Sequence, residues 1–201
     1  MRTIAAAGPI TFLNPSQIEQ RLKGVNLVRL MERAFAAFSR GEAVIPAPGE
    51  LLFEEPPGEV HIKYGYLKTG DTYVIKIASG FWNNPAHGLS SSDGLLLVFR
   101  KDTGELAAVL NDHGRLTDLR TAAAGAVAAK DLAPEQIENV GVLGTGIQAE
   151  LQAQLLQAVR PCRNIVFWRR NPERGNAYAE RMRDRGFLVE TAWSPAEAAL
   201  R

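Results

Sequence analysis

A short apolar run, a glycine-rich turn and a helical pattern follow one another in the second half of this 201-residue chain, and they restrict its fold most. Residues 140–149 read Val-Gly-Val-Leu-Gly-Thr-Gly-Ile-Gln-Ala. In a G-x-G-x-x-A turn the first glycine permits a tight change of direction, the second lets a phosphate approach the backbone, and the alanine lets the helix pack closely on the strand. Free amides at the helix N-terminus attract the phosphates. The candidate cofactor residues of the turn are Gly144, Thr145, Gly146, Gln148 and Ala149.

The segments around this turn favour a dinucleotide site over an ordinary strand-to-helix turn. Strand and helix patterns alternate to the end of the sequence, which predicts a parallel α/β layer. We expect residues 136–201 to form the first half of a Rossmann domain, a parallel βαβαβ unit. The expected strands are 140–143, 165–168 and 187–190, and the expected helices are 147–159 and 172–185.

The end of the second expected strand bears on which dinucleotide binds. An NAD site usually has an acidic residue there, about 20 residues beyond the glycines. This chain has Trp168-Arg169-Arg170-Asn171 instead, with Arg174 close by. Guanidinium groups pair with a 2′-phosphate through bidentate hydrogen bonds. Arg169 and Arg170 are therefore candidate cofactor residues, NADP(H) is favoured over NAD(H), and solvated surface arginines are the alternative.

The first half of the chain has a different pattern, typical of an α+β module. Asn14-Pro15-Ser16 predicts a helix start, and apolar residues spaced through 27–38 predict a second helix. Alternating runs at 60–64 and 73–77 predict strands. The continuous apolar run 95–99 predicts a central strand buried on both faces.

Composition excludes several classes of protein. Hydrophobic residues make up 46% and charged residues 22%, which is typical of globular domains and not of disordered chains. A net charge of +1 gives no reason to expect nucleic-acid binding, and no apolar run is long enough to cross a membrane. The single cysteine, Cys162, cannot form an internal disulfide. Because the N-terminus also lacks a secretory pattern, we expect a cytoplasmic protein.

Three sequence features together resemble the ornithine cyclodeaminase/mu-crystallin family. They are Lys76 on an expected strand, the stretch Leu-Thr-Asp-Leu-Arg-Thr-Ala-Ala at 116–123, and the glycine turn with Leu-Ala-Pro at 132–134 before it. The resemblance extends from Thr11 to the last residue. Residues 61–66, His-Ile-Lys-Tyr-Gly-Tyr, look like a bacterial subgroup with members in ectoine utilisation.

The resemblance implies two functional parts and a homodimer. An N-terminal substrate-binding and dimerisation module would cover residues 1–120, followed by a connecting helix at 121–135 and by the incomplete Rossmann domain at 136–201. The strand lysine of the family matches Lys76, and the arginine before Thr-Ala-Ala matches Arg120.

The chemistry of such an enzyme suits these residue types. Hydride transfer between a nicotinamide ring and an amino or imino acid requires the substrate to be held rigidly, and its carboxylate is best held by cations. Lys63, Lys76 and Arg120 are the candidates. Lys76 would act as acid or base on the imine or only clamp the carboxylate, and Arg120 would contact either the carboxylate or the cofactor.

The chain departs from the family pattern at two places. Cyclodeaminases carry a substrate-binding arginine soon after the Val-x-Pro connector, where this chain has Pro48. A threonine that meets the cofactor is also missing, and its place falls near Asp93-Gly94. Both departures argue against ornithine itself as the substrate.

The expected function is that of an NAD(P)-dependent oxidoreductase or deaminase acting on a small amino or imino acid. One alternative is a non-catalytic NADPH-binding protein of the mu-crystallin type. The other is an inactive fragment, because only the first half of a Rossmann domain lies before Arg201. On that view we expect the 201-residue chain to be unstable or inactive, with an exposed strand edge that favours association.

Overall fold

A computed structural model describes residues 8–201 and divides the chain into two compact units. The first unit consists of the segment up to Val25 together with Ala34–Leu116, and the second consists of Asn26–Arg33 together with Thr117–Arg201. The predicted domain bounds, 1–120, 121–135 and 136–201, stay a prediction. The predicted lack of a secretory pattern rests partly on residues 1–7, which lie outside the described residues.

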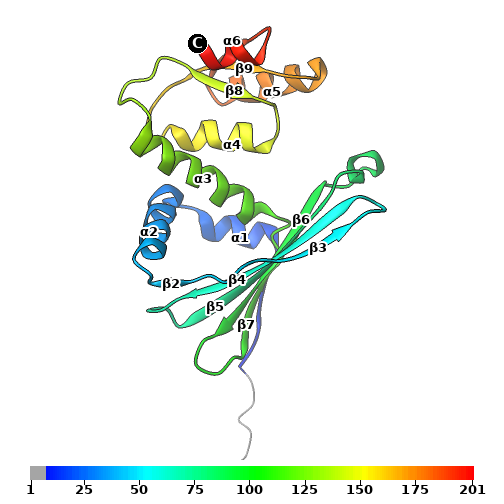
Figure 1. Cartoon of the computed structure of the whole chain (residues 1–201), viewed down its shortest axis with the longest axis vertical. Helices are drawn as coiled ribbons and strands as arrows, with labels where there is room; N and C mark the ends of the chain where they lie inside the picture. The colour runs from blue at the N-terminus through cyan, green and yellow to red at the C-terminus, as the bar shows by residue number, and fades with distance from the viewer. Residues whose placement is uncertain (1–7) are drawn as a thin grey trace, which may run out of the picture. The chain divides into compact units, whose positions relative to one another are not determined.

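The first unit is built on a sheet of seven described strands (Figure 1). Their order is β1-β7-β6-β5-β4-β2, and β3 pairs with β4 beside this path. Neighbouring strands are antiparallel except β1 and β7, which are parallel. The strands are β1 (Thr11–Leu13), β2 (Ala43–Val44), β3 (Gly49–Phe53), β4 (Gly58–Leu67), β5 (Thr72–Phe81), β6 (Ser92–Arg100) and β7 (Leu106–Leu110).

One expectation about this sheet is wrong. The run 95–99 lies in β6, between β5 and β7, so its central position is confirmed. All five of its residues are half-buried, however, and not buried on both faces. The expectation took a continuous apolar run as the sign of a strand covered on both sides, whereas an antiparallel sheet can leave one face uncovered.

The expected helices of the first half are present. The helix α1 (Pro15–Leu22) begins at a capping box, in which Asn14 Oδ1 accepts from the Gln17 amide and Gln17 Oε1 accepts from the Asn14 amide, each at 3.0 Å. The longer α2 (Leu27–Ser39) follows, and a short 3₁₀ helix, η1 (Asn84–His87), lies between β5 and β6. No helix in the described part of the chain is long and apolar enough to cross a membrane.

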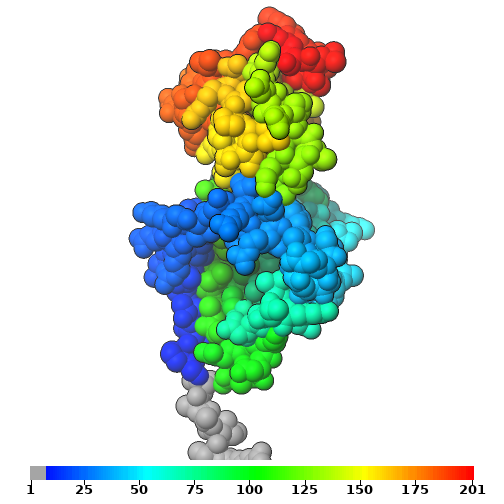
Figure 2. Space-filling view, turned by 90° about the vertical axis from the view of Figure 1, so that its left-hand side faces the viewer, coloured from blue at the N-terminus to red at the C-terminus, as the bar shows by residue number. Residues whose placement is uncertain are grey.

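The second unit contains a parallel sheet in the order β10-β9-β8, which confirms the expected α/β layer. Its yellow-to-red segments pack into one body in the space-filling view (Figure 2). Ile165 and Phe167 of the sheet pack against Tyr178 and Met182 to form the core. The elements are α3 (Arg115–Leu132), β8 (Val140–Leu143), α4 (Ile147–Leu156), β9 (Asn164–Trp168), α5 (Pro172–Asp184), β10 (Leu188–Thr191) and α6 (Pro195–Leu200).

The alanine-rich run lies in α3, which packs closely against its neighbours. Ala122, Ala123 and Ala126 are buried, and Val28 at the start of α2 contacts this helix. Small side chains permit this close packing and also favour a helix.

The hydroxyl of Tyr178 is enclosed in the core beside the carboxylate of Glu150. Burial is the main cause that raises the pKa of this phenol, and the negative charge of Glu150 raises it further.

We predict that Gly141→Ala destabilises the second unit. A Cβ atom at this position of β8 would lie 2.2 Å from the backbone oxygen of Ala198, so α6 has to shift. The expected loss in the free energy of unfolding is about 1–3 kcal/mol, measured by urea denaturation. Gly146→Ala is the matched control, because nothing lies within 4 Å of its added Cβ. Equal stability of the two variants would contradict the close packing of α6 on β8.

Candidate functional site

The glycine turn between β8 and α4 leaves the N-terminus of α4 available to a ligand. Gly144 has a φ of +112°, in the left-handed region, and its amide donates to the backbone oxygen of Trp168 at 3.0 Å. Gly146 is the N-cap residue of α4 and makes no side-chain capping hydrogen bond. The first amides of a helix lack partners within that helix, so without a capping side chain they can donate to an anion.

An acidic residue in the first turn of α4 does not oppose such binding. Glu150 is buried, and its carboxylate lies 2.6 Å from Arg181 Nη2 and 3.7 Å from Arg185 Nη2 on α5. These two guanidinium groups compensate the carboxylate charge and tie α4 to α5. The positive end of the α4 dipole therefore keeps its attraction for an anion.

A cavity of about 600 Å³ lies beside the glycine turn. It brings together two segments that are apart in the sequence, the glycine turn and the stretch from the end of β9 to the start of α5. Asn171 caps α5, since its Oδ1 accepts from the Arg174 amide at 3.0 Å. The cavity thus has glycines on one side and arginines on the other. The lining residues are Gly144, Thr145, Gly146, Trp168, Arg170, Asn171, Pro172 and Arg174.

The two consecutive arginines at the end of β9 lie in different surroundings. Arg170 is exposed and lines the cavity. Arg169 is half-buried and lies over α5, where its Cδ is 2.0 Å from the position of a Cβ added to Gly175. Its Nε is buried without a hydrogen-bond partner among the described residues. The structure therefore brings Arg170 to the glycine turn with Arg174, a candidate outside the predicted set, and directs Arg169 against α5.

Gln148 and Ala149 line a second cavity, of about 350 Å³, between α3, α4 and β8. Gln148 Nε2 donates to the backbone oxygen and to Oδ1 of Asp118, each at 3.2 Å, and so links α4 to α3. Ala149 is half-buried against the core of the sheet. These two residues position the helix that follows the glycine turn, and neither lines the cavity that contains Arg170.

The predicted substrate lysines face each other across the first sheet. Lys63 of β4 and Lys76 of β5 are directly opposite in the antiparallel register. Lys63 is exposed and Lys76 is half-buried. The register therefore places both side chains on the same face of the sheet, on neighbouring strands. Arg120 is exposed on the part of α3 that belongs to the second unit.

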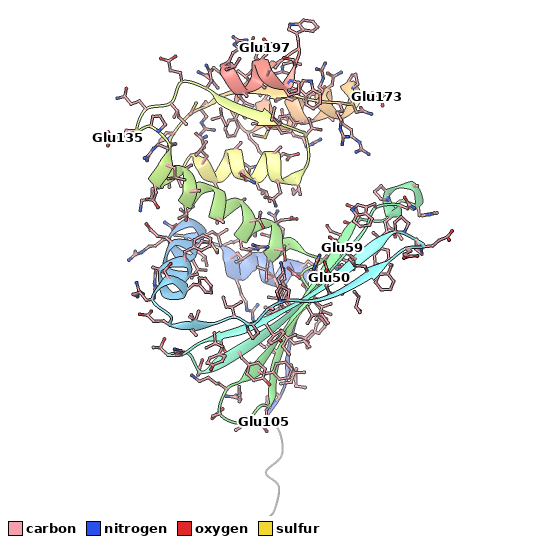
Figure 3. All side chains as sticks on the ribbon, viewed as in Figure 1. Glu50, Glu59, Glu105, Glu135, Glu173 and Glu197 are labelled. Carbon is pink, nitrogen blue, oxygen red and sulfur yellow. The ribbon has the colours of Figure 1, made fainter. Side chains whose placement is uncertain are left out.

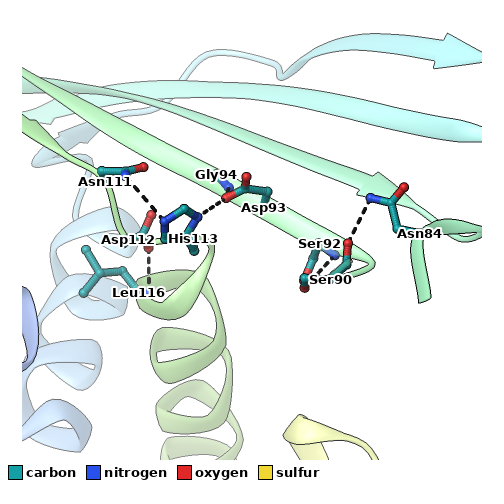
Figure 4. A network of polar contacts seen from close by, with 9 residues as sticks. All are labelled: Asn84, Ser90, Ser92, Asp93, Gly94, Asn111, Asp112, His113 and Leu116. Carbon is teal, nitrogen blue, oxygen red and sulfur yellow. Dashed lines mark hydrogen bonds and ion pairs between the residues drawn. The ribbon is translucent and has the colours of Figure 1, made fainter. Parts of the chain in front are cut away.

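A polar network before α3 was not anticipated from the sequence (Figure 4). His113 has a φ of +49°, and its Nδ1 lies 2.9 Å from Asp93 Oδ1. Asp112 is buried, and its Oδ2 accepts from the Leu116 amide at 2.7 Å, which caps the start of α3. Asp93, at the start of β6, therefore contacts the His113 ring that precedes α3.

Comparison with known proteins decides the family. The profile of the ornithine cyclodeaminase/mu-crystallin family matches residues 11–201. The chain belongs to this family. It is 36% identical to an uncharacterized cyclodeaminase of Sinorhizobium fredii, over 87% of this chain and 53% of that protein.

Solved structures of family-like proteins share the fold. The Δ1-pyrroline-2-carboxylate reductase of Thermococcus litoralis, in complex with NADH and L-proline, superposes with a TM-score of 0.88 at 28% identity over 94% of this chain and 58% of that one. An archaeal alanine dehydrogenase dimer with bound NAD gives a TM-score of 0.82 at 25% identity, over 91% of this chain and 56% of the dehydrogenase chain. The chain thus spans just over half the length of these relatives.

Proposed function

We propose that this family member binds a nicotinamide dinucleotide at the glycine turn and acts on a small amino or imino acid. The main observation behind this proposal is the cavity that is lined by the turn before the uncapped N-terminus of α4 and by Arg170 and Arg174. The pyrophosphate would bind to the amides after Gly144 and Gly146, where both the helix dipole and free donors are present. Bound there, the nicotinamide supplies hydride transfer.

The described lining of this cavity favours NADP(H) over NAD(H). Arg170 and Arg174 are both exposed cations, and none of the described lining residues is acidic. A ribose 2′-hydroxyl would find no carboxylate acceptor there, whereas a 2′-phosphate would find two guanidinium groups. Arg169, which packs on Gly175, would support the turn from β9 into α5.

The proposed cofactor preference is tested by replacing the cavity arginines. Arg170→Gln and Arg174→Gln should each weaken NADPH binding by about tenfold, because a hydrogen bond to a charged group contributes about 1.5–3 kcal/mol. NADH binding should change little, and both affinities are measured by fluorescence titration. Arg183→Gln, near the other end of α5, is the control. Tighter binding of NADH than of NADPH by the unaltered chain would refute the preference.

The substrate carboxylate would bind between Lys63 and Lys76. Their opposite positions on β4 and β5 support this assignment, because a carboxylate can accept hydrogen bonds from two neighbouring cations. Arg120 is the third candidate and would contact either the carboxylate or the cofactor. The relatives named for cyclodeaminase, imine-reductase and amino-acid dehydrogenase activities share amino and imino acids as their substrate class, which supports this assignment.

We predict that Lys76→Ala abolishes turnover and leaves NADPH binding intact, because the lysine belongs to the sheet of the first unit and the cofactor cavity to the second. Turnover is followed by NADPH absorbance with a panel of cyclic imines and α-amino acids. Lys23→Ala, an exposed lysine at the end of α1, is the matched control. Unchanged turnover in the Lys76 variant would remove this residue from the site. An unaltered chain that binds NADPH but turns over none of the panel would favour the non-catalytic alternative.

We also propose a homodimer formed through the first unit. Side chains alternate along β4, so that Tyr64 and Tyr66 lie on the opposite face of the strand from Lys63. Both tyrosines are exposed and line a largely apolar cavity of about 750 Å³. Large exposed apolar patches commonly mark protein–protein contacts. The archaeal alanine dehydrogenase that shares this fold is a dimer.

Light scattering after gel filtration tests the proposed dimer. The unaltered chain should elute at twice its chain mass. Tyr64→Glu should give monomers, because removing a carboxylate from water into a largely apolar interface is costly. Lys63→Glu, on the opposite face of the same strand, should leave the mass unchanged. A monomeric unaltered chain at high micromolar concentration would contradict the proposal.

A further inference from the structure

One histidine and two glutamates gather on the hairpin of β3 and β4, outside the cavity assigned to the cofactor. Glu50 of β3 is the direct register partner of His61 on β4. Glu59 lies two residues before His61 on the same strand, so its side chain is on the same face. Figure 3 shows Glu50 and Glu59 near each other on the sheet. The pairing of β3 with β4 brings Glu50 to His61, and the alternation of side chains along β4 brings Glu59 to the same face.

The imidazole of His61 lies between the two carboxylates. Its Nδ1 is 3.6 Å from Glu50 Oε1, and its Nε2 is 3.4 Å from Glu59 Oε1. One ligand atom from each of the three residues can be chosen so that all three lie within 4.8 Å of one another. The side chains of His61, Glu59 and Glu50 are 30%, 37% and 51% exposed, so the cluster lies at the surface and is open to a small ion.

We propose that Glu50, Glu59 and His61 bind a divalent first-row transition metal ion of the Zn²⁺ class. Metal–ligand bonds of about 2.1 Å in tetrahedral geometry place the donor atoms about 3.4 Å apart. One nitrogen of His61 and one oxygen of each glutamate lie within 4.8 Å of one another, so a side-chain rotation has to bring them onto one ion. One imidazole with two carboxylates is a donor set that suits Zn²⁺, Co²⁺ or Ni²⁺, whereas Mg²⁺ and Ca²⁺ prefer oxygen ligands alone. Water completes the coordination, because the three residues leave at least one position open.

The backbone opposite Glu59 leaves room for this arrangement. Gly80 of β5 is the register partner of Glu59. A Cβ atom on Gly80 would touch the glutamate, at 3.5 Å from its Cγ and 3.6 Å from its Oε1. These are ordinary van der Waals distances, so the backbone at position 80 does not obstruct the Glu59 carboxylate.

A competing account treats the cluster as ion pairs between a protonated His61 and the two carboxylates. The two accounts differ in their response to metal. Coordination by the three side chains predicts that added metal binds at this cluster. An ion pair needs the charged imidazole and responds to no metal. Metal titration of the whole chain therefore distinguishes them.

The test is a Zn²⁺ titration in competition with a chromophoric chelator. The unaltered 201-residue chain should bind one Zn²⁺ at this site, and Co²⁺ in its place should give a visible absorption band. His61→Ala and Glu59→Gln should each weaken Zn²⁺ binding by at least about tenfold. His87→Ala, in η1, is the matched control and should leave the affinity unchanged.

Two results would overturn the proposal. One is an unaltered chain that binds no Zn²⁺. The other is binding that survives His61→Ala, because this places the ion elsewhere. Circular dichroism without metal shows whether each variant folds, and Glu59→Gln decides the question if the histidine variant does not. NADPH affinity measured in parallel is expected to stay constant, so the outcome is independent of the proposed cofactor site.

Discussion

The change of direction between β8 and α4 depends on a backbone conformation that glycine adopts without strain. Gly144 has a φ of +112°, and its amide is bonded to the end of β9 through Trp168. This turn places the uncapped N-terminus of α4 beside the segment that carries Arg170. A side chain at position 144 would strain the turn, so the position of the α4 N-terminus, where we propose that the phosphates bind, depends on this glycine.

In the first unit, the register between neighbouring strands determines which polar side chains lie together. The pairing of β4 with β5 sets Lys63 opposite Lys76, and the pairing of β3 with β4 sets Glu50 opposite His61. Because side chains alternate along a strand, these polar groups share one face, and the exposed tyrosines Tyr64 and Tyr66 lie on the other. A shift of register by one residue would exchange the two faces. The proposed substrate site and the proposed dimer contact therefore depend on the same hydrogen-bond ladder.

Local patterns made much of this predictable from the sequence. The α1 cap at Asn14, the parallel layer and the glycine turn each depend on residues close in the sequence, and all three are present. Features that depend on distant segments were not predictable. The different surroundings of Arg169 and Arg170 depend on where Gly175 of α5 packs.

Two further features of the first unit also could not be predicted from local sequence patterns. The partial exposure of the apolar run in β6 depends on which face of the sheet is covered, and composition alone does not reveal this. The cluster around His61 depends on the pairing of β3 with β4, and β3 was not among the expected strands. Register between strands is set by the whole sheet, so single-strand patterns do not specify which side chains meet.

Hydrogen–deuterium exchange with and without NADPH tests the central claim most directly, because it reports on the backbone amides that the account assigns to the phosphates. The account predicts slower exchange at residues 144–149 and 168–174 when NADPH is bound, and little change in β4 and β5. Slower exchange confined to other segments, or no change at saturating NADPH, would contradict the assignment of the glycine turn and its arginines as the cofactor site.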